Sequence, residues 1–136
     1  MESNTITPLD LQSEYYRILA ALRIAATVAI LFAAWWLYAG YSFVTSSVEV
    51  FENMVTGGVD ALPSLTKLVL NQAHLCAAVG GLTIFAGLGG VWLSRCRISG
   101  LIYFCLLGTA PAFLLSILFH LTVSRSLHTV FTRFAA

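Results

Sequence analysis

Residues 68–94 read LVLNQAHLCAAVGGLTIFAGLGGVWLS and contain no Asp, Glu, Lys or Arg. A helix needs about 20 apolar residues to cross the roughly 30 Å of hydrocarbon in a bilayer. This stretch is long enough, whereas a lone strand would leave its backbone amides and carbonyls without partners in lipid. The sequence therefore predicts a transmembrane helix here.

Two further stretches without charged residues flank this one, between Arg23 and Glu49 and between Arg97 and Arg125. Each is also long enough for a membrane-spanning helix. Together they predict an all-α membrane protein, with three spans in a single polytopic domain. The predicted spans cover about 22–42, 70–93 and 100–123, and the predicted domain covers 1–136.

The composition favours the same class of protein. Of the residues, 59% are hydrophobic and 10% are charged, against about 25% charged in soluble domains. The net charge of +1 provides no basic field, so we expect no nucleic-acid partner. The expected partners are the lipid bilayer and either another membrane protein or a second copy of this chain.

The first helix is predicted to begin outside its span. Thr7 suits the N-cap, Pro8 suits the first helical position, and Asp10 places a carboxylate in the first turn. We therefore expect one helix to start near Pro8 and to continue into the membrane.

Two segments outside the spans have the apolar periodicity of amphipathic helices. In residues 45–69, apolar side chains recur every three or four positions from Val48 to Leu62. Residues 125–134 show the same pattern between basic and hydroxyl side chains. We expect both to lie at the membrane interface. A re-entrant loop is the alternative for 45–69, although its carboxylates make insertion costly.

Residues 44–72 carry a resemblance to a known family. The string VEVFENM at 48–54, the glycine pair at 57–58 and LPSLTK at 62–67 resemble the periplasmic loop of the inner-membrane platform proteins of type II secretion and type IV pilus assembly. The resemblance implies a bacterial inner membrane and a cytoplasmic N-terminus. The large cytoplasmic domains of that family have no counterpart in the short 94–99 loop. The loop residues of interest are Phe51, Glu52, Leu62, Pro63 and Thr66.

The positive charges near the span ends favour the same orientation. Four arginines lie on the N-terminal side, with Arg95 and Arg97 together in the short loop, against three basic residues on the other side. We expect the N-terminus in the cytoplasm. The basic character of residues 125–134 would suit a cytoplasmic leaflet instead, and both orientations stay open at this point.

Small residues predict how the helices pack, because close backbone approach holds helices together in lipid. The second span places small side chains at alternating spacings of four and three. This face is either the centre of a three-helix monomer or a surface for self-association or a partner. Pro111 should kink the third span. The packing-face residues are Cys76, Gly80, Thr83, Gly87, Gly90 and Ser94, with Gly108, Ala112 and Ser116 in the third span and Ala21, Ala25, Ala29 and Ala33 in the first.

The sequence contains little that could carry chemistry. No span contains an acidic residue, lysine or arginine, which argues against pumping or ion-coupled transport, and no catalytic motif is present. His74 and His120 are predicted at similar depth. They are either two ligands for a b-type haem or interfacial polar groups. We expect no enzyme activity, no cofactor and no metal site.

Three functions fit these features. The first is a non-enzymatic accessory or assembly subunit of an inner-membrane complex. The second is an immunity protein that blocks a pore-forming toxin within the membrane, because a toxin helix could pack on the second span. The third is a haem-binding electron-transfer subunit that uses His74 and His120.

Overall fold

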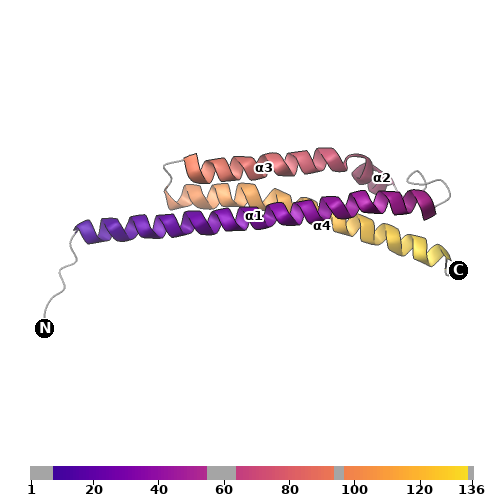
Figure 1. The fold of residues 1–136 in the computed structure, drawn as a ribbon, viewed down its shortest axis with the longest axis horizontal. Coiled ribbons are helices and arrows are strands. Elements are labelled where there is room, and N and C mark those ends of the chain that lie inside the picture. Colours follow the sequence, from indigo (N-terminus) through magenta and orange to yellow (C-terminus); the bar gives the residue numbers. More distant parts are fainter. Residues whose placement is uncertain (1–7, 55–63, 94–96, 135–136) are drawn as a thin grey trace, which may run out of the picture.

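The computed structural model describes residues 8–54, 64–93 and 97–134. Its elements are α1 (Pro8–Met54), α2 (Ser64–Asn71), α3 (Ala73–Leu93) and α4 (Ile98–Phe134), and no strand occurs in these ranges. Three of the helices, α1, α3 and α4, are long and apolar enough to cross a membrane. The prediction of an all-α chain is confirmed, and three helices have the length and the apolar composition that the three predicted spans require. Figure 1 shows the three helices side by side, with α2 at one end of α3.

α1 is much longer than a membrane crossing. Its 47 residues extend about 70 Å at 1.5 Å per residue, and it begins at Pro8 as the sequence predicts. It also continues through residues 45–54, where the sequence favours a separate interfacial helix. The physical reason is that Val44, Ser47 and Phe51 are all buried, so packing continues past the predicted end of the span.

The other parts of the two predicted interfacial segments have different outcomes. Residues 55–63, which include Leu62, Pro63 and the glycine pair, lie outside the described residues, and 64–71 form α2. Residues 125–134 extend α4 rather than forming a helix of their own. Leu127 and Val130 pack against the core, which holds this segment in line with α4.

The buried face of α1 repeats like a coiled coil. Its spacing alternates between three and four residues from Ala26 onward, which is the 3.5-residue repeat of left-handed helix packing. Ala21 and Ala25 are exposed, contrary to the predicted alanine stripe, because a spacing of four drifts about 40° around a helix per step. The buried residues are Leu19, Ala26, Ile30, Ala33, Leu37, Gly40, Val44, Ser47 and Phe51.

The backbones of α3 and α4 come into direct contact at a pair of glycines. A Cβ atom on Gly87 would lie 2.7 Å from the Cα of Gly108 and 2.9 Å from the backbone oxygen of Phe104. Gly108 is in turn covered by α1, because its own Cβ would lie 3.1 Å from Cγ1 of Ile30. The three helices therefore meet at one point, where two of them have no side chain.

Other glycines extend this contact in both directions. A Cβ on Gly80 would lie 2.6 Å from Cδ2 of Leu37, and one on Gly90 would overlap the ring of Phe104. Between α1 and α4, a Cβ on Gly40 would lie 3.0 Å from Oγ of Ser116. Glycines thus allow close contact between the helices along much of the bundle. Such contact is expected where lipid supplies no hydrophobic driving force between helices.

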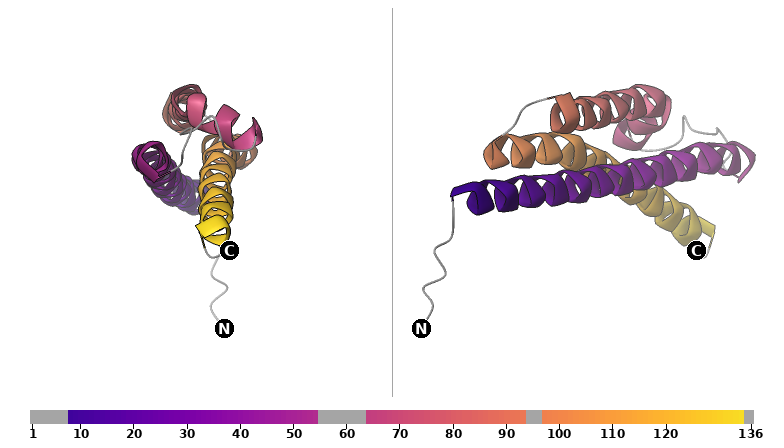
Figure 2. Two further views of the ribbon diagram at one scale, coloured as in Figure 1. Left: turned by 90° about the vertical axis from the view of Figure 1, so that its right-hand side faces the viewer. Right: turned by 60° about the vertical axis from the view of Figure 1, so that its left-hand side comes forward.

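α4 changes direction along its length. Pro111 lies inside the helix, where it removes one backbone hydrogen bond and its ring crowds the preceding turn. Figure 2 shows the first half of α4 beside α3 and the second half diverging from it. The C-terminal half therefore leaves α3, while α4 also contacts α1 and α2.

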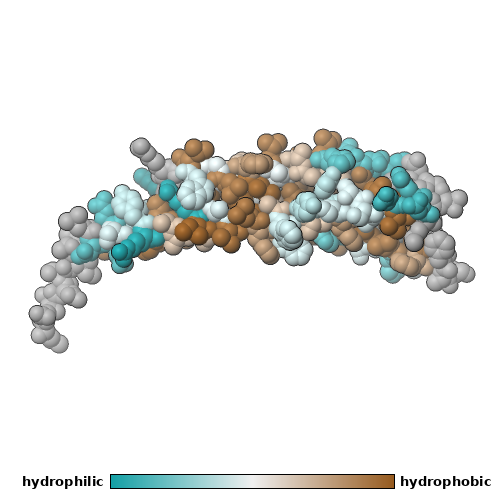
Figure 3. Space-filling model, in the orientation of Figure 1, coloured by the Kyte–Doolittle hydropathy of each residue, from teal (hydrophilic) through white to brown (hydrophobic). Residues whose placement is uncertain are grey.

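The surface is apolar in the middle and polar toward the ends. Figure 3 shows hydrophobic residues over the centre of one face and hydrophilic residues near the two ends. At the α2 end, a small core continues past the predicted spans. It contains Phe51, Thr66, Val69, Val123 and Ser126, all buried.

We predict opposite effects for two glycine substitutions in α3. Gly87→Ala should destabilise the bundle by about 1–3 kcal/mol, because the new methyl group meets backbone atoms that cannot move aside. Gly81→Ala should leave stability unchanged or raise it by roughly 0.5–1 kcal/mol, because no atom lies within 4 Å of that Cβ position. Thermal unfolding of both variants in the same detergent measures the difference. Equal effects would contradict this packing.

Candidate functional site

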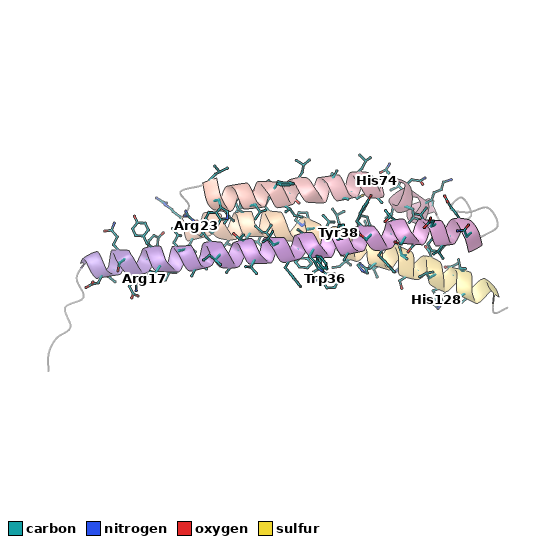
Figure 4. All side chains as sticks on the ribbon, in the orientation of Figure 1. Arg17, Arg23, Trp36, Tyr38, His74 and His128 are labelled. Atoms are coloured by element: carbon teal, nitrogen blue, oxygen red, sulfur yellow. The ribbon has the colours of Figure 1, made fainter. Side chains whose placement is uncertain are left out.

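The two candidate histidines have separate environments. Nδ1 of His74 in α3 lies 2.6 Å from the hydroxyl of Tyr41 in α1, and the two rings are 5.5 Å apart. His74 is exposed, and Figure 4 shows its side chain directed toward α1. The contact between Tyr41 and His74 links the start of α3 to α1.

His120 in α4 packs among aromatic rings. Its ring stacks on Phe43 at a centroid distance of 5.4 Å and an angle of 18°, and it meets the edge of Trp36 at 6.2 Å. Its Nδ1 lies 2.8 Å from the backbone oxygen of Ser116 one turn earlier. These contacts give His120 a structural role at the junction of α1 and α4.

The structure does not bring the two imidazoles to one cavity. His74 contacts α1 at Tyr41 and His120 contacts it at Phe43. Side chains two positions apart on a helix point about 200° apart, so α1 separates the two rings. The groove beside His120 is lined by Trp36, Phe113 and neighbouring residues of α4, without His74. In the described part of the chain, no group of three or more His, Cys, Asp or Glu could hold a metal ion.

We predict that the purified protein does not form a bis-histidine haem complex when haemin is added. The physical reason is that one iron needs both ring nitrogens on opposite sides of the same porphyrin. A haemin titration followed at the Soret band measures this, with His74→Ala and His120→Ala as controls. A six-coordinate spectrum that disappears in either variant would contradict the assignment of separate roles.

The predicted packing-face residues lie mostly inside the bundle. Gly80, Gly87, Gly108, Ala112 and Ser116 are buried, and the Ser116 hydroxyl donates a 2.9 Å hydrogen bond to the backbone oxygen of Trp36.

The other members of that face are less enclosed. Cys76, Thr83 and Gly90 are half-buried, and Ser94 lies outside the described residues. Most of this face is thus occupied by α1 and α4 of the same chain, which leaves little of it for a partner. Gly40, a contact of Ser116, is absent from the predicted set, although it fits the 3.5-residue repeat.

The residues of the first outer segment have three different environments. Phe51 is 1% exposed and anchors the end of α1, whereas Glu52 is exposed. Thr66 in α2 is buried, and its hydroxyl oxygen lies 3.4 Å from that of Ser126 in α4. Phe51 and Thr66 therefore support the fold, and Glu52 is left at the surface.

The N-terminal part of α1 is a helix that the bundle does not bury. Residues 10–18 are all exposed, and Figure 1 shows this part of α1 extending past the ends of α3 and α4. We call residues 10–18 the arm. Figure 4 shows Arg17 on the arm and Arg23 just after it.

An apolar stripe follows one side of the arm. Leu11, Tyr15, Ile18 and Leu22 recur at spacings of four, three and four, and each is at least 38% exposed. These spacings place the four side chains on one face of the helix. Such a stripe is typical of helices that pair with another helix.

The stripe leads into a groove in the bundle. A groove of about 330 Å³ lies between α1 and the beginning of α4, lined almost wholly by apolar side chains. Leu22 belongs to both the stripe and the groove. Ala25 and Ala26 form its floor on α1, and Leu101, Ile102 and Leu106 form its wall on α4. The arm stripe and this groove make up the candidate docking site.

Comparison of the chain with protein-family models, with curated proteins and with solved structures finds no match. The resemblance of residues 44–72 to the platform-protein loop accordingly stays a prediction. The functional argument depends on the geometry of the arm, the grooves and the helix contacts.

Proposed function

We propose that this chain is a non-enzymatic accessory or assembly subunit of a membrane protein complex, placed in a bacterial inner membrane with its N-terminus in the cytoplasm. The observation that carries the proposal is the arm, an extended and exposed helix with one apolar stripe. The partner is a membrane protein that contributes a helix along the stripe and into the adjoining groove.

The energetics of the arm support a partner. Residues 10–18 continue the packed part of α1 and are all exposed, so the bundle leaves their apolar side chains at the surface. A partner helix would bury Leu11, Tyr15 and Ile18, each of which is at least 44% exposed. Burying a large apolar side chain contributes about 1.5–3 kcal/mol, so even three such residues stabilise an interface substantially.

The glycine contacts inside the bundle also support a docking role for the arm. Gly80, Gly87 and Gly108 hold α1, α3 and α4 together, so the bundle does not need a partner to complete its core. A preformed bundle with one uncovered helix suits a subunit that docks on a larger assembly. The proposed orientation follows from the arginines at this end, Arg17 and Arg23 among them.

We predict that the arm, and not the outer face of α3, contacts a partner in native membranes. A photo-crosslinking amino acid at Ile18 should give one larger adduct that can be identified by mass spectrometry. The same probe at Leu82, an apolar α3 residue that is 70% exposed, is the matched control and should give no protein adduct. Adducts at Leu82 alone would assign the interface to α3 and overturn the proposal.

Filling the groove should weaken the same contact. Ala25 is exposed, so Ala25→Leu adds volume to the groove without entering the core. We expect this variant to lower the Ile18 adduct at least about tenfold, because a single lost apolar contact of about 1.4 kcal/mol changes an equilibrium tenfold. Ala78→Leu on the exposed side of α3 is the control. An adduct that consists of two copies of this chain would show self-association instead of a distinct partner.

A further inference from the structure

A second groove lies at the opposite end of the bundle from the candidate docking site. It has a volume of about 490 Å³ and lies mainly along the C-terminal half of α4, with Thr66 of α2 on one side. Its lining changes along α4, from Leu118 and Leu121 to Arg125 and His128. One end of the groove is therefore apolar, and the other is cationic and polar.

The groove crosses the expected boundary between hydrocarbon and water. Arg125 is the first charged residue after Arg97, so it marks the level where the third span ends. Leu121 lies about one helical turn deeper in the membrane than Arg125, and Leu118 lies nearly two turns deeper. Both leucines are exposed. The apolar end thus lies at the depth of acyl chains, and Arg125 lies at the depth of lipid headgroups.

The polar end offers hydrogen-bond donors. Arg125 and His128 are exposed side chains on successive turns of α4, and a guanidinium presents several N–H groups in a planar fork. Figure 4 shows His128 on the C-terminal half of α4. The Thr66 hydroxyl also lines the groove. Its oxygen lies 3.4 Å from that of Ser126, whose proton is donated to the Thr122 backbone oxygen. This contact is long, so the Thr66 hydroxyl can rotate and donate its proton to a ligand.

The charge of the lining selects the ligand. None of the described residues that line the groove is acidic, and a guanidinium such as that of Arg125 forms strong bidentate hydrogen bonds with phosphate oxygens. The neighbouring hydroxyls carry no negative charge that would pair with Arg125. The hydroxyls of Thr122, Ser126 and Thr129 already donate to backbone oxygens one turn back in α4. An anionic ligand with an apolar tail matches both ends of the groove.

We propose that this groove binds one anionic phospholipid, with its phosphate against Arg125, His128 and the Thr66 hydroxyl and an acyl chain along Leu118 and Leu121. The site is independent of the docking site on α1, which lies at the other end of the molecule. A bound lipid would fix the C-terminal half of α4 at the membrane surface, beyond the kink at Pro111.

Native mass spectrometry of the protein in detergent, titrated with phosphatidylglycerol or phosphatidylcholine, tests this proposal. The wild type should retain one phosphatidylglycerol and bind it at least about tenfold more tightly than phosphatidylcholine. Arg125→Gln combined with His128→Gln should weaken phosphatidylglycerol binding at least about tenfold, because hydrogen bonds to charged groups are lost. Both residues are exposed, and unchanged thermal unfolding without lipid verifies the fold.

Two controls distinguish a built lipid site from general charge attraction and from a site for free phosphate. Arg17→Gln removes a positive charge from an exposed position at the other end of the bundle and should leave lipid binding unchanged. An equal loss in Arg17→Gln would show general charge attraction and overturn the proposal, as would full binding by the double variant. Displacement of the lipid by millimolar inorganic phosphate, together with unchanged lipid binding in Leu121→Asn, would assign the groove to free phosphate and also overturn it.

Discussion

The approach of the α3 and α4 backbones at Gly87 and Gly108 is the constraint on which the rest of the structure depends. No side chain separates the two helices there, and Ile30 of α1 covers Gly108 from the third side. In lipid, apolar surface gains nothing by leaving solvent, so close contact between complementary backbones has to hold the helices. A side chain at Gly87 would push α3 away from α4, and a side chain at Gly108 would displace Ile30, which is fully buried.

The glycines form contacts between helices inside the bundle, so the two ends of the bundle are the surfaces left for interactions. At one end, the arm of α1 and the groove at Leu22 and Ala25 offer an apolar surface for a helix. At the other end, the kinked half of α4 and Thr66 form a groove with a cationic rim. The sides between them are apolar and suit lipid (Figure 3). The proposed docking and lipid sites thus lie on different parts of the chain from the apolar sides.

The sequence predicts the architecture well because charged residues are excluded from the hydrocarbon, so the stretches without charge locate all three spans. The alternating small residues of α3 likewise predict its buried side, since Gly80 and Gly87 follow the 3.5-residue repeat. The sequence does not predict that α1 continues to Met54, because the burial of Phe51 in the core depends on packing between helices and not on the local sequence. The partners of His74 and His120 depend in the same way on how α1 packs against α3 and against α4.

The most direct test is the contact between the two glycines in a bilayer. Magic-angle-spinning NMR of the protein with ¹³C-labelled glycine Cα atoms detects pairs of labelled carbons that are close in space. The account predicts a cross-peak between Gly87 and Gly108, which belong to different helices and lie in backbone contact. Absence of this cross-peak, with transfer from Gly87 to lipid acyl chains in its place, would show that the small face of α3 is directed outward and would contradict the account.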